Sequence, residues 1–233
     1  MKVKASLHLH TKEDVNEEYP IDYSIFDLID LSAENGMKVL ALTGHENCAT
    51  TPKMVAYAAK QGILLIPGIE IELGGKHTLI LNADKSAEAV DSFDKLRQYR
   101  QTHPHCFVIA VHPNFKFHSI GLDNLEKYRD LFDAVEHSWF YSRLINLNLR
   151  TAQLAKKLGL PMIATADLHL TKYFTTDYAV LDLKELTIPA VFEAIRTGKF
   201  ENVSRLKKLS EMIGFELKTL LAKIKNKLPD LNH

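Results

Sequence analysis

The sequence is poor in cysteine and contains no long apolar segment. Only two of its 233 residues are cysteines, Cys48 and Cys106, and no CxxC pair occurs. This excludes a disulfide-rich scaffold and a thiolate zinc site, and it is typical of a reducing compartment. The first residues lack the apolar run of a signal peptide, and no stretch approaches the roughly 18 apolar residues that span a membrane. We therefore expect a cytoplasmic protein with no membrane partner.

The chain also has no excess of charge of either sign, because 29 Lys and Arg balance 29 Asp and Glu. Overall electrostatics therefore do not favour a nucleic-acid partner. Hydrophobic residues make up 46% of the chain, so a chain of this length can bury the core of one large domain. What the sequence does contain is histidine: there are 11, several of them beside carboxylates.

Short apolar segments alternate with segments of helical period along most of the chain. The predicted strands are Val3–Leu9, Val39–Thr43, Leu64–Leu73, Thr78–Asn82, Phe107–Val111, Ala134–His137 and Met162–Ala166. The helices predicted between them begin at prolines or capping residues and end at glycines, and one of them covers Ser142–Leu158. Repeated strand–helix units predict a parallel sheet with right-handed crossovers. We therefore expect an α/β fold, a distorted (β/α)7 barrel similar to a TIM barrel, with an open doubly wound sheet as the alternative.

Two segments depart from this alternation. Gly74-Gly75 joins two predicted strands in what we expect to be a hairpin. Between Ser204 and Leu228, leucines and isoleucines recur at helical spacing with lysines between them. We expect a barrel over residues 1–200 and a C-terminal helical extension over 201–233, packed on the barrel or on a second subunit. A basic surface for nucleic acid is the alternative for this extension.

Histidines and carboxylates recur where the predicted strands end. Side chains two apart on a strand share a face, so His8 and His10 can bind one metal ion together. Comparable positions at the ends of later strands are held by His45, Glu70, His112, Asp167 and His169. Because barrel folds gather catalytic groups at the carboxyl ends of their strands, these residues predict a metal site. His103 and His105 have the same spacing but precede their strand, so we expect them at the opposite end.

Three further positions extend the predicted site. The hairpin should bring His77 back beside Glu70. The loop after His10 carries several carboxylates, of which we favour Asp14 as a ligand, with Glu17 or Glu18 as alternatives. Glu136 ends its own strand with the same parity, and we expect it to orient a ligand from behind.

These motifs resemble those of the PHP (polymerase and histidinol phosphatase) superfamily, in the same order over most of residues 3–170. The motifs are His8-Leu-His10-Thr, Leu-Thr-Gly-His45-Glu, Pro-Gly-Ile-Glu70, His77, His112-Pro-Asn and Thr-Ala-Asp167-Leu-His169. The chain is most similar to the small stand-alone members. Two departures stand out: Gly44 replaces the usual aspartate, and the loop after His10 is longer.

The resemblance implies a seven-stranded barrel with a trinuclear centre. One ion would take His8, His10, Glu70 and Asp167, a second Glu70, His77 and His112, and a third Asp14, His45 and His169. Imidazole and carboxylate ligands suit two or three Zn²⁺, Mn²⁺ or Fe²⁺ ions. Such ions supply hydroxide at neutral pH and neutralise charge on a phosphoryl group. We therefore expect a phosphoesterase acting on a small monoester, such as a nucleotide or histidinol phosphate, with Glu70, Asp167 and His112 as its catalytic residues.

Two rival functions remain from the sequence: a nuclease acting on a phosphodiester, and a non-catalytic assembly subunit. Nucleic acid is the less favoured partner. For binding a phosphate we favour Arg143, Lys116 and Lys172, which follow strand ends. The aromatic run Trp139-Phe-Tyr141, with Phe115 and Phe117, would either stack on a nucleobase or cap the mouth of the barrel.

Overall fold

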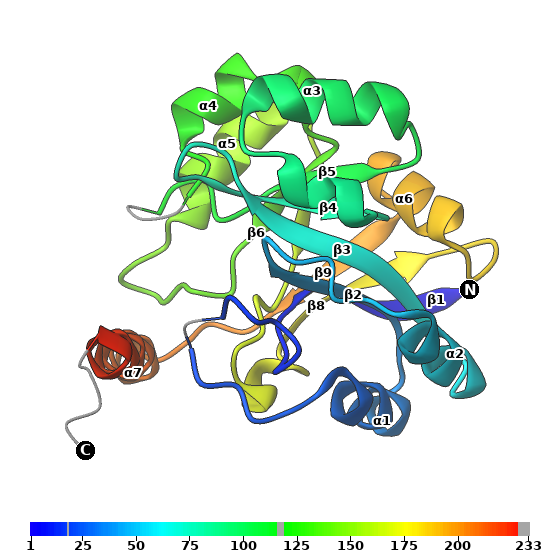
Figure 1. Ribbon diagram of the computed structural model, residues 1–233. Coiled ribbons are helices and arrows are strands. Elements are labelled where there is room, and N and C mark those ends of the chain that lie inside the picture. Colours follow the sequence, from blue (N-terminus) through cyan, green and yellow to red (C-terminus); the bar gives the residue numbers. More distant parts are fainter. Residues whose placement is uncertain (18, 116–118, 228–233) are drawn as a thin grey trace.

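The structure is a computed structural model that describes residues 1–17, 19–115 and 119–227 (Figure 1). Its strands are β1 (Lys2–Leu9), β2 (Met37–His45), β3 (Leu64–Glu72), β4 (His77–Leu81), β5 (Phe107–Ala110), β6 (Ala134–His137), β7 (Met162–Ala164), β8 (Asp177–Asp182) and β9 (Phe200–Ser204). Its α-helices are α1 (Ile25–Asn35), α2 (Pro52–Lys60), α3 (Phe93–Thr102), α4 (Leu122–Lys127), α5 (Asn148–Leu158), α6 (Ile188–Arg196) and α7 (Leu209–Lys227). Three 3-10 turns lie at Lys85–Ala89, Arg129–Leu131 and Thr171–Tyr173.

The strands form one sheet in the order β7-β6-β5-β4-β3-β2-β1-β8-β9, which curls into a nearly closed barrel. This confirms the predicted fold class, and all seven predicted strands are present. The hairpin is also confirmed, since β3 and β4 are antiparallel and turn at Gly74-Gly75. Two strands were not predicted. β8 and β9 pair antiparallel with each other, and β8 pairs antiparallel with β1, so neither belongs to a strand–helix repeat.

One asparagine side chain bridges the two ends of the sheet. On β9, Asn202 Oδ1 accepts a hydrogen bond from the backbone N–H of Ala164 at 2.8 Å. Its Nδ2 donates to the carbonyl of Met162, also at 2.8 Å. An amide side chain carries an N–H donor and a C=O acceptor like those of a peptide group. Asn202 thus replaces the backbone hydrogen bonds that would otherwise join β7 to β9.

The interior of the barrel is filled by alternating side chains, and α6 closes its amino-terminal end. Val3, Ala5 and Leu7 of β1 belong to the same buried cluster as Phe192 and Ile195 of α6. The helix begins after Thr187, whose side chain accepts a hydrogen bond from the backbone of the first turn. Because this end is plugged by apolar side chains, polar groups inside the barrel can gather only at the carboxyl end.

The remaining helices pack outside the barrel, with α1 and α2 on one side and α3, α4 and α5 on the other (Figure 1). The predicted helix over Ser142–Leu158 was too long at its start. Residues 142–147 form a turn closed by a hydrogen bond from Ser142 N–H to the carbonyl of Ile145, and α5 begins at Asn148. Within the described residues, no helix is long and apolar enough to cross a membrane.

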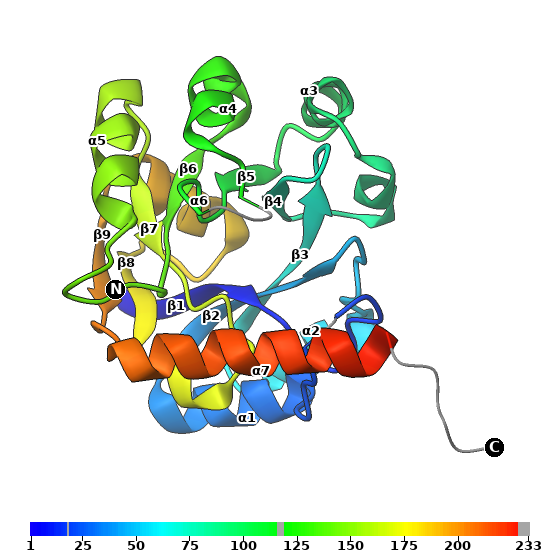
Figure 2. The ribbon, with the colours of Figure 1, turned by 90° about the vertical axis from the view of Figure 1, so that its left-hand side faces the viewer.

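The C-terminal helix α7 runs across the face of the barrel where the strands end (Figure 2). The predicted boundary between residues 200 and 201 falls within β9, which belongs to the sheet, and α7 begins at Leu209. Met212 is buried against the barrel, whereas Ile213 and Leu217 are about half exposed. The extension therefore packs on the barrel through one of its faces.

Replacing Asn202 tests how far its side chain closes the barrel. We expect Asn202→Ala to lower the free energy of unfolding by about 1–2 kcal/mol, because two backbone groups of β7 lose their partners. Urea denaturation measures this. Glu201→Gln is the matched control on the same strand, since the described partner of the Glu201 side chain is the exposed Lys2. Equal stability of the two variants would show that the bridge contributes nothing.

Candidate metal centre

A β-bulge in β1 turns His8 and His10 into the barrel. Ser6 pairs with Leu40 and Leu9 pairs with Leu42, so β1 has one residue more than β2 across this interval. Leu7 faces the interior, but Leu9 lies in the outer layer, and the face that points inward changes between them. Bulges re-aim side chains in this way and are common beside active sites. His8 and His10 are consequently both fully buried at the carboxyl end of the barrel.

The carboxylate of Glu70 lies at the centre of the cluster. Its Oε2 is 3.2 Å from Nε2 of His8, 3.4 Å from Nε2 of His10 and 3.3 Å from Nε2 of His45. Its other oxygen, Oε1, is 2.9 Å from Nδ1 of His77 and 3.9 Å from Nε2 of His112. Glu70 therefore presents one oxygen to each of two sets of imidazoles.

Asp167 adds a second carboxylate to the His8–His10 pair. Its Oδ1 lies 3.4 Å from Nε2 of both rings, and these two nitrogens are 3.1 Å apart. The backbone φ of Asp167 is +42° and that of His112 is +28°, values that non-glycine residues seldom adopt. Such backbone conformations cost of order 1–3 kcal/mol and cluster at functional sites. Leu168 pairs with the end of β1, which holds Asp167 in place.

The loop after His10 contributes two carboxylates. Asp14 Oδ2 accepts from the backbone N–H of His45 at 2.8 Å and lies 2.9 Å from Nδ1 of the same ring. Glu17 Oε2 lies 3.2 Å from Nε2 of His169 and 3.6 Å from Nδ1 of His10. The sequence favoured Asp14 alone, with Glu17 as an alternative, whereas the structure brings both to the cluster. Glu18, the other alternative, lies outside the described residues.

Gly44 provides the space that the Asp14 side chain occupies. A Cβ at position 44 would lie 3.2 Å from Cγ of Asp14 and 3.0 Å from the carbonyl oxygen of Asn47. Position 44 therefore lacks the usual aspartate, but the longer loop after His10 brings the carboxylate of Asp14 beside His45 in its place.

Glu136 supports the cluster from behind, as predicted. It is fully buried, and its Oε1 accepts hydrogen bonds from Nδ1 of His8, at 3.0 Å, and from the hydroxyl of Thr165. Its Oε2 accepts from the backbone N–H of His112 at 2.6 Å. With Nδ1–H of His8 donating to Glu136, Nε2 of that ring is left to bind a cation.

The carboxylates shift the protonation of the rings in the metal-free protein. Burial alone would lower the pKa of His8, but Asp167 and Glu70 outweigh it and raise that pKa to about 10. Burial would also lower the pKa values of His10 and His77. The neighbouring carboxylates outweigh this effect and raise both pKa values. In return, the imidazoles hold the pKa of Glu70 well below its usual range despite its burial.

Among the described residues, three groups of side chains could each hold a metal ion. In each group the ligand atoms lie within 4.8 Å of one another. The groups are His8, His10 and Asp167; His45, Glu70 and His77; and His10, Asp14, Glu17 and His45. The buried Oε2 of Glu17 has no well-directed hydrogen bond from any described group, as expected of an oxygen that faces a cation. The donor set therefore fits divalent transition metals.

These groupings differ from the ligand sets that the resemblance implies. His45 takes a place beside Glu70 and His77, whereas His112 lies farther from Glu70. His169 contacts Glu17 and does not join the group of Asp14 and His45. All nine predicted ligands nevertheless lie in one connected cluster.

An open cavity of about 1570 Å³ leads from this cluster to the surface. Glu70, Asp167 and His112, the predicted catalytic residues, all line it. The predicted phosphate ligands Arg143 and Lys172 are exposed and do not line the cavity, and Lys116 lies outside the described residues. Apart from histidines, the basic residue among the described residues of the lining is Arg150, on the first turn of α5. Arg143 was expected to open this helix, but it precedes α5, which begins at Asn148.

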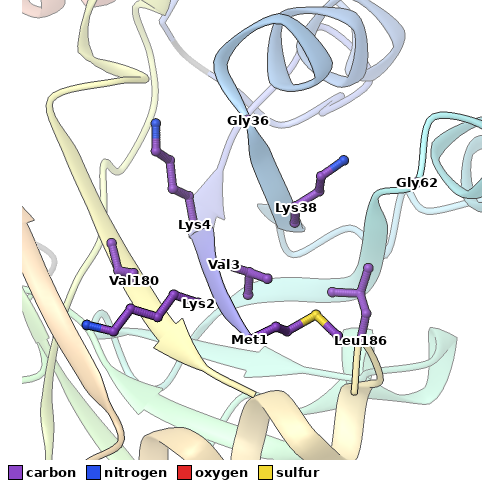
Figure 3. A pocket seen from close by; sticks show the side chains of 9 residues that line it. All are labelled: Met1, Lys2, Val3, Lys4, Gly36, Lys38, Gly62, Val180 and Leu186. Atoms are coloured by element: carbon purple, nitrogen blue, oxygen red, sulfur yellow. The ribbon is translucent and has the colours of Figure 1, made fainter. Parts of the chain in front are cut away.

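A second cavity, of about 470 Å³, lies at the opposite end of β1 (Figure 3). Its lining consists of Met1, Lys2, Val3, Lys4, Gly36, Lys38, Gly62, Val180 and Leu186. It contains no histidine, carboxylate or cysteine side chain, and Lys4 Nζ already donates to the carbonyl of Asn35. The described residues that line this cavity therefore offer no ligand set for a metal. His103 also lies away from the cluster, stacked on Tyr99 of α3.

A model of the PHP domain matches residues 6–147, more than half of the chain. The chain belongs to the PHP domain family. Of curated proteins, none matches it.

Solved structures with the same fold agree with this assignment. A two-domain protein from Bacteroides vulgatus, described as containing a predicted PHP-like metal-dependent phosphoesterase, superposes with a TM-score of 0.68 at 16% identity, over 95% of this chain and 70% of that one. PsfC from Pseudomonas syringae gives 0.62 at 13% identity, over 96% and 99%. An amidohydrolase from Chromobacterium violaceum, with bound sulfate and no metal, gives 0.57 at 14% identity, over 84% and 97%. At these identities the likeness concerns the fold.

Replacing Gly44 tests the packing of Asp14. We expect Gly44→Ala to displace the Asp14 carboxylate and to weaken metal binding at the group of His10, Asp14, Glu17 and His45 by roughly tenfold or more. Competition with a chelator, read by elemental analysis, measures the affinity. Gly214→Ala is the matched control, because a Cβ there meets nothing within 4 Å. Unchanged metal affinity in Gly44→Ala would contradict the role assigned to this contact.

Metal uptake should release protons. The pKa of His8, raised to about 10, keeps this ring protonated at pH 7 in the metal-free protein, whereas a metal ion binds neutral imidazole. The pKa values of His10 and His77 are raised in the same direction. Affinity should therefore rise as the pH increases toward the pKa of His8. Titration calorimetry in buffers of different ionisation enthalpy counts the protons, and we expect about one or more per ion. A heat of binding independent of the buffer would contradict a protonated cluster.

Proposed function

We propose that this protein is a metal-dependent hydrolase that cleaves a phosphate ester with two or three divalent ions, Zn²⁺, Mn²⁺ or Fe²⁺. The observation that supports this most directly is the position of Glu70. Its two oxygens face different sets of imidazoles, so this one side chain can bridge two cations. Divalent ions held here would lower the pKa of a water molecule and neutralise the charge that develops on a phosphoryl group.

The chain's own residues position these groups. Glu136 fixes the ring of His8, and Asp14 fixes that of His45. Burial lowers the pKa of His112, so at neutral pH its imidazole is neutral and can bind a cation or accept a proton at the cavity wall. Arg150 places a guanidinium on the same wall, where it can pair with phosphate oxygens.

The charge of the cavity favours a small monoester over nucleic acid. Arg150 is the only lysine or arginine among the described residues that line it, whereas Glu46, Glu72 and Glu216 add negative charge. A protein that tracks a nucleic-acid backbone neutralises many phosphates with Lys and Arg. A small phosphorylated molecule therefore suits this cavity better than a strand does.

The experiment that tests the proposal is a panel of esters assayed with Mn²⁺ or Zn²⁺. We expect hydrolysis of p-nitrophenyl phosphate and little or none of bis(p-nitrophenyl) phosphate. Faster cleavage of the diester would favour the nuclease, which is the second candidate. Activity on amide bonds alone would favour an amidohydrolase. With no hydrolysis at all by metal-loaded protein, the proposal would fail.

The effects of substitutions should follow distance from the cluster. Glu70→Gln should lose bound metal and lower kcat/KM by roughly 100-fold or more, because it removes the bridging carboxylate. Glu136→Gln should cost about 10–100-fold, since Glu136 supports His8 and the backbone of His112 from behind the cluster. His103→Asn, a histidine substitution at the other end of the barrel, is the control. Wild-type activity in Glu70→Gln would contradict the assignment.

A further inference from the structure

We propose that the outward face of α7 is an interface with a second copy of this chain, in which the two α7 helices pack antiparallel. Four apolar side chains of this helix recur every four residues: Leu209, Ile213, Leu217 and Leu221. Residues four apart lie on one side of a helix, so these side chains form a single ridge along α7. The interface lies outside the metal centre and does not depend on the reaction proposed above.

This ridge is exposed although it is apolar. The exposed fractions of its side chains run from 39% for Leu209 to 64% for Leu221. The exposed Leu220 lies beside it and lines the same cavity as Ile145 and Leu149, so the apolar surface continues across the rim of that cavity. We define the α7 patch as Ile145, Leu149, Leu206, Leu209, Ile213, Leu217, Leu220 and Leu221. A partner seated on it would cover part of the rim.

The size of the α7 patch fits a dimer interface. From the exposed fractions of its members, it presents roughly 700 Å² of apolar surface, more than the ~300–600 Å² of the largest patch on a typical monomer. A standard interface buries about 800 Å² of each partner, of which somewhat more than half is apolar. The patch can therefore supply the apolar part of one such interface.

The helix that carries the patch is fixed to the barrel by its other face. Just before α7, Nζ of Lys207 lies 2.5 Å from Oδ2 of Asp177 on β8, and both side chains are fully buried. Farther along, the ring of Phe215 stacks on Tyr19 at 5.6 Å and meets Trp139 edge-on at 5.0 Å. Because these contacts hold α7 across the barrel, the outward leucines cannot turn inward (Figure 2). Only a second molecule can remove them from water.

The charges of α7 favour a second copy in antiparallel orientation. Two acidic residues, Glu211 and Glu216, precede Leu217, whereas the residues that follow it include Lys218, Lys223, Lys225 and Lys227. Parallel pairing would bring lysines against lysines. Antiparallel pairing brings the acidic half of each helix against the basic half of the other. A two-fold interface uses the same surface on both subunits, and this distribution of charge is complementary to itself.

Glu216 and Lys223 give the pairing its register. They are seven residues apart, nearly two turns, and so occupy one flank of the ridge. A two-fold axis midway between them brings Glu216 of each copy beside Lys223 of the other. Glu211 already pairs with Arg205, whereas Glu216 is exposed and has no ion-pair partner among the described residues. An acidic side chain beside the ridge also makes an anionic membrane a poorer occupant than a second copy.

Sedimentation equilibrium of the full chain, loaded with Mn²⁺, tests the interface. We expect a dimer with a Kd of about 10 µM. Leu217→Lys should raise this Kd roughly 100-fold or more, because it places a charge in the apolar ridge opposite the basic half of the partner helix. Val55→Lys, at an exposed apolar position of α2, is the matched control and should dimerise as the wild type does. Circular dichroism, with the fluorescence of Trp139 beside Phe215, checks that α7 remains folded on the barrel.

Exchange of charges tests the antiparallel register. Glu216→Lys and Lys223→Glu should each raise the Kd about tenfold, since each brings like charges together twice in the dimer. An equimolar mixture of the two variants, one of them isotope-labelled, should form heterodimers with the Kd of the wild type. Native mass spectrometry distinguishes these heterodimers from the two homodimers.

A wild-type chain that remains monomeric at about 100 µM would overturn the inference. So would a dimer that Leu217→Lys leaves intact, or a mixture of the two charge variants that does not recover the affinity. Monomers that bind vesicles of phosphatidylcholine and phosphatidylserine, and lose this binding in Leu217→Lys, would identify a membrane as the occupant of the face and would also overturn it.

Discussion

Burial of many ionisable groups in one small volume is the constraint on which this structure depends. Glu70, His8 and His10 are almost completely removed from solvent. An isolated buried charge is strongly unfavourable, so each such group needs partners of opposite charge or a bound cation. The reciprocal pKa shifts of Glu70 and the imidazoles express this dependence. The bulge in β1, the positive φ angles and the buried Glu136 all serve to hold these groups together.

The barrel provides this arrangement through its asymmetry. α6 plugs the amino-terminal end with apolar side chains, which leaves the carboxyl end for polar groups. There α7, anchored by Lys207 and Asp177, covers part of the opening and leaves a cavity beside the cluster. The helix that was expected to pack on the barrel or on a second subunit thus contributes residues to the lining of the cavity. A C-terminal segment outside the matched PHP region, residues 6–147, thereby contributes to the site.

Strand-end periodicity was sufficient to predict most of the centre. Side chains two apart share a face, and the ends of barrel strands converge, so His8, His10, Glu70 and Asp167 could be placed together without coordinates. The strands β8 and β9 escaped prediction because they pair antiparallel and lie outside the strand–helix repeat.

Contacts between distant loops could not be predicted in the same way. The pairing of Asp14 with Gly44 depends on the path of a long loop, which periodicity does not determine. The place of Arg150 in the cavity lining depended on where α5 begins, and helix ends are poorly defined by sequence. Phe215 lies far along the chain from the motifs, and nothing in its local pattern connected it to His169.

The number of divalent transition-metal ions bound per chain tests the central claim most directly. Elemental analysis of the purified protein, after growth with Zn²⁺, Mn²⁺ and Fe²⁺ and removal of loosely bound ions, gives this number. The account predicts two or three ions per chain, since the three groups found among the described residues overlap only through His10 and His45. Protein that binds no such ion, even after reconstitution, would contradict it.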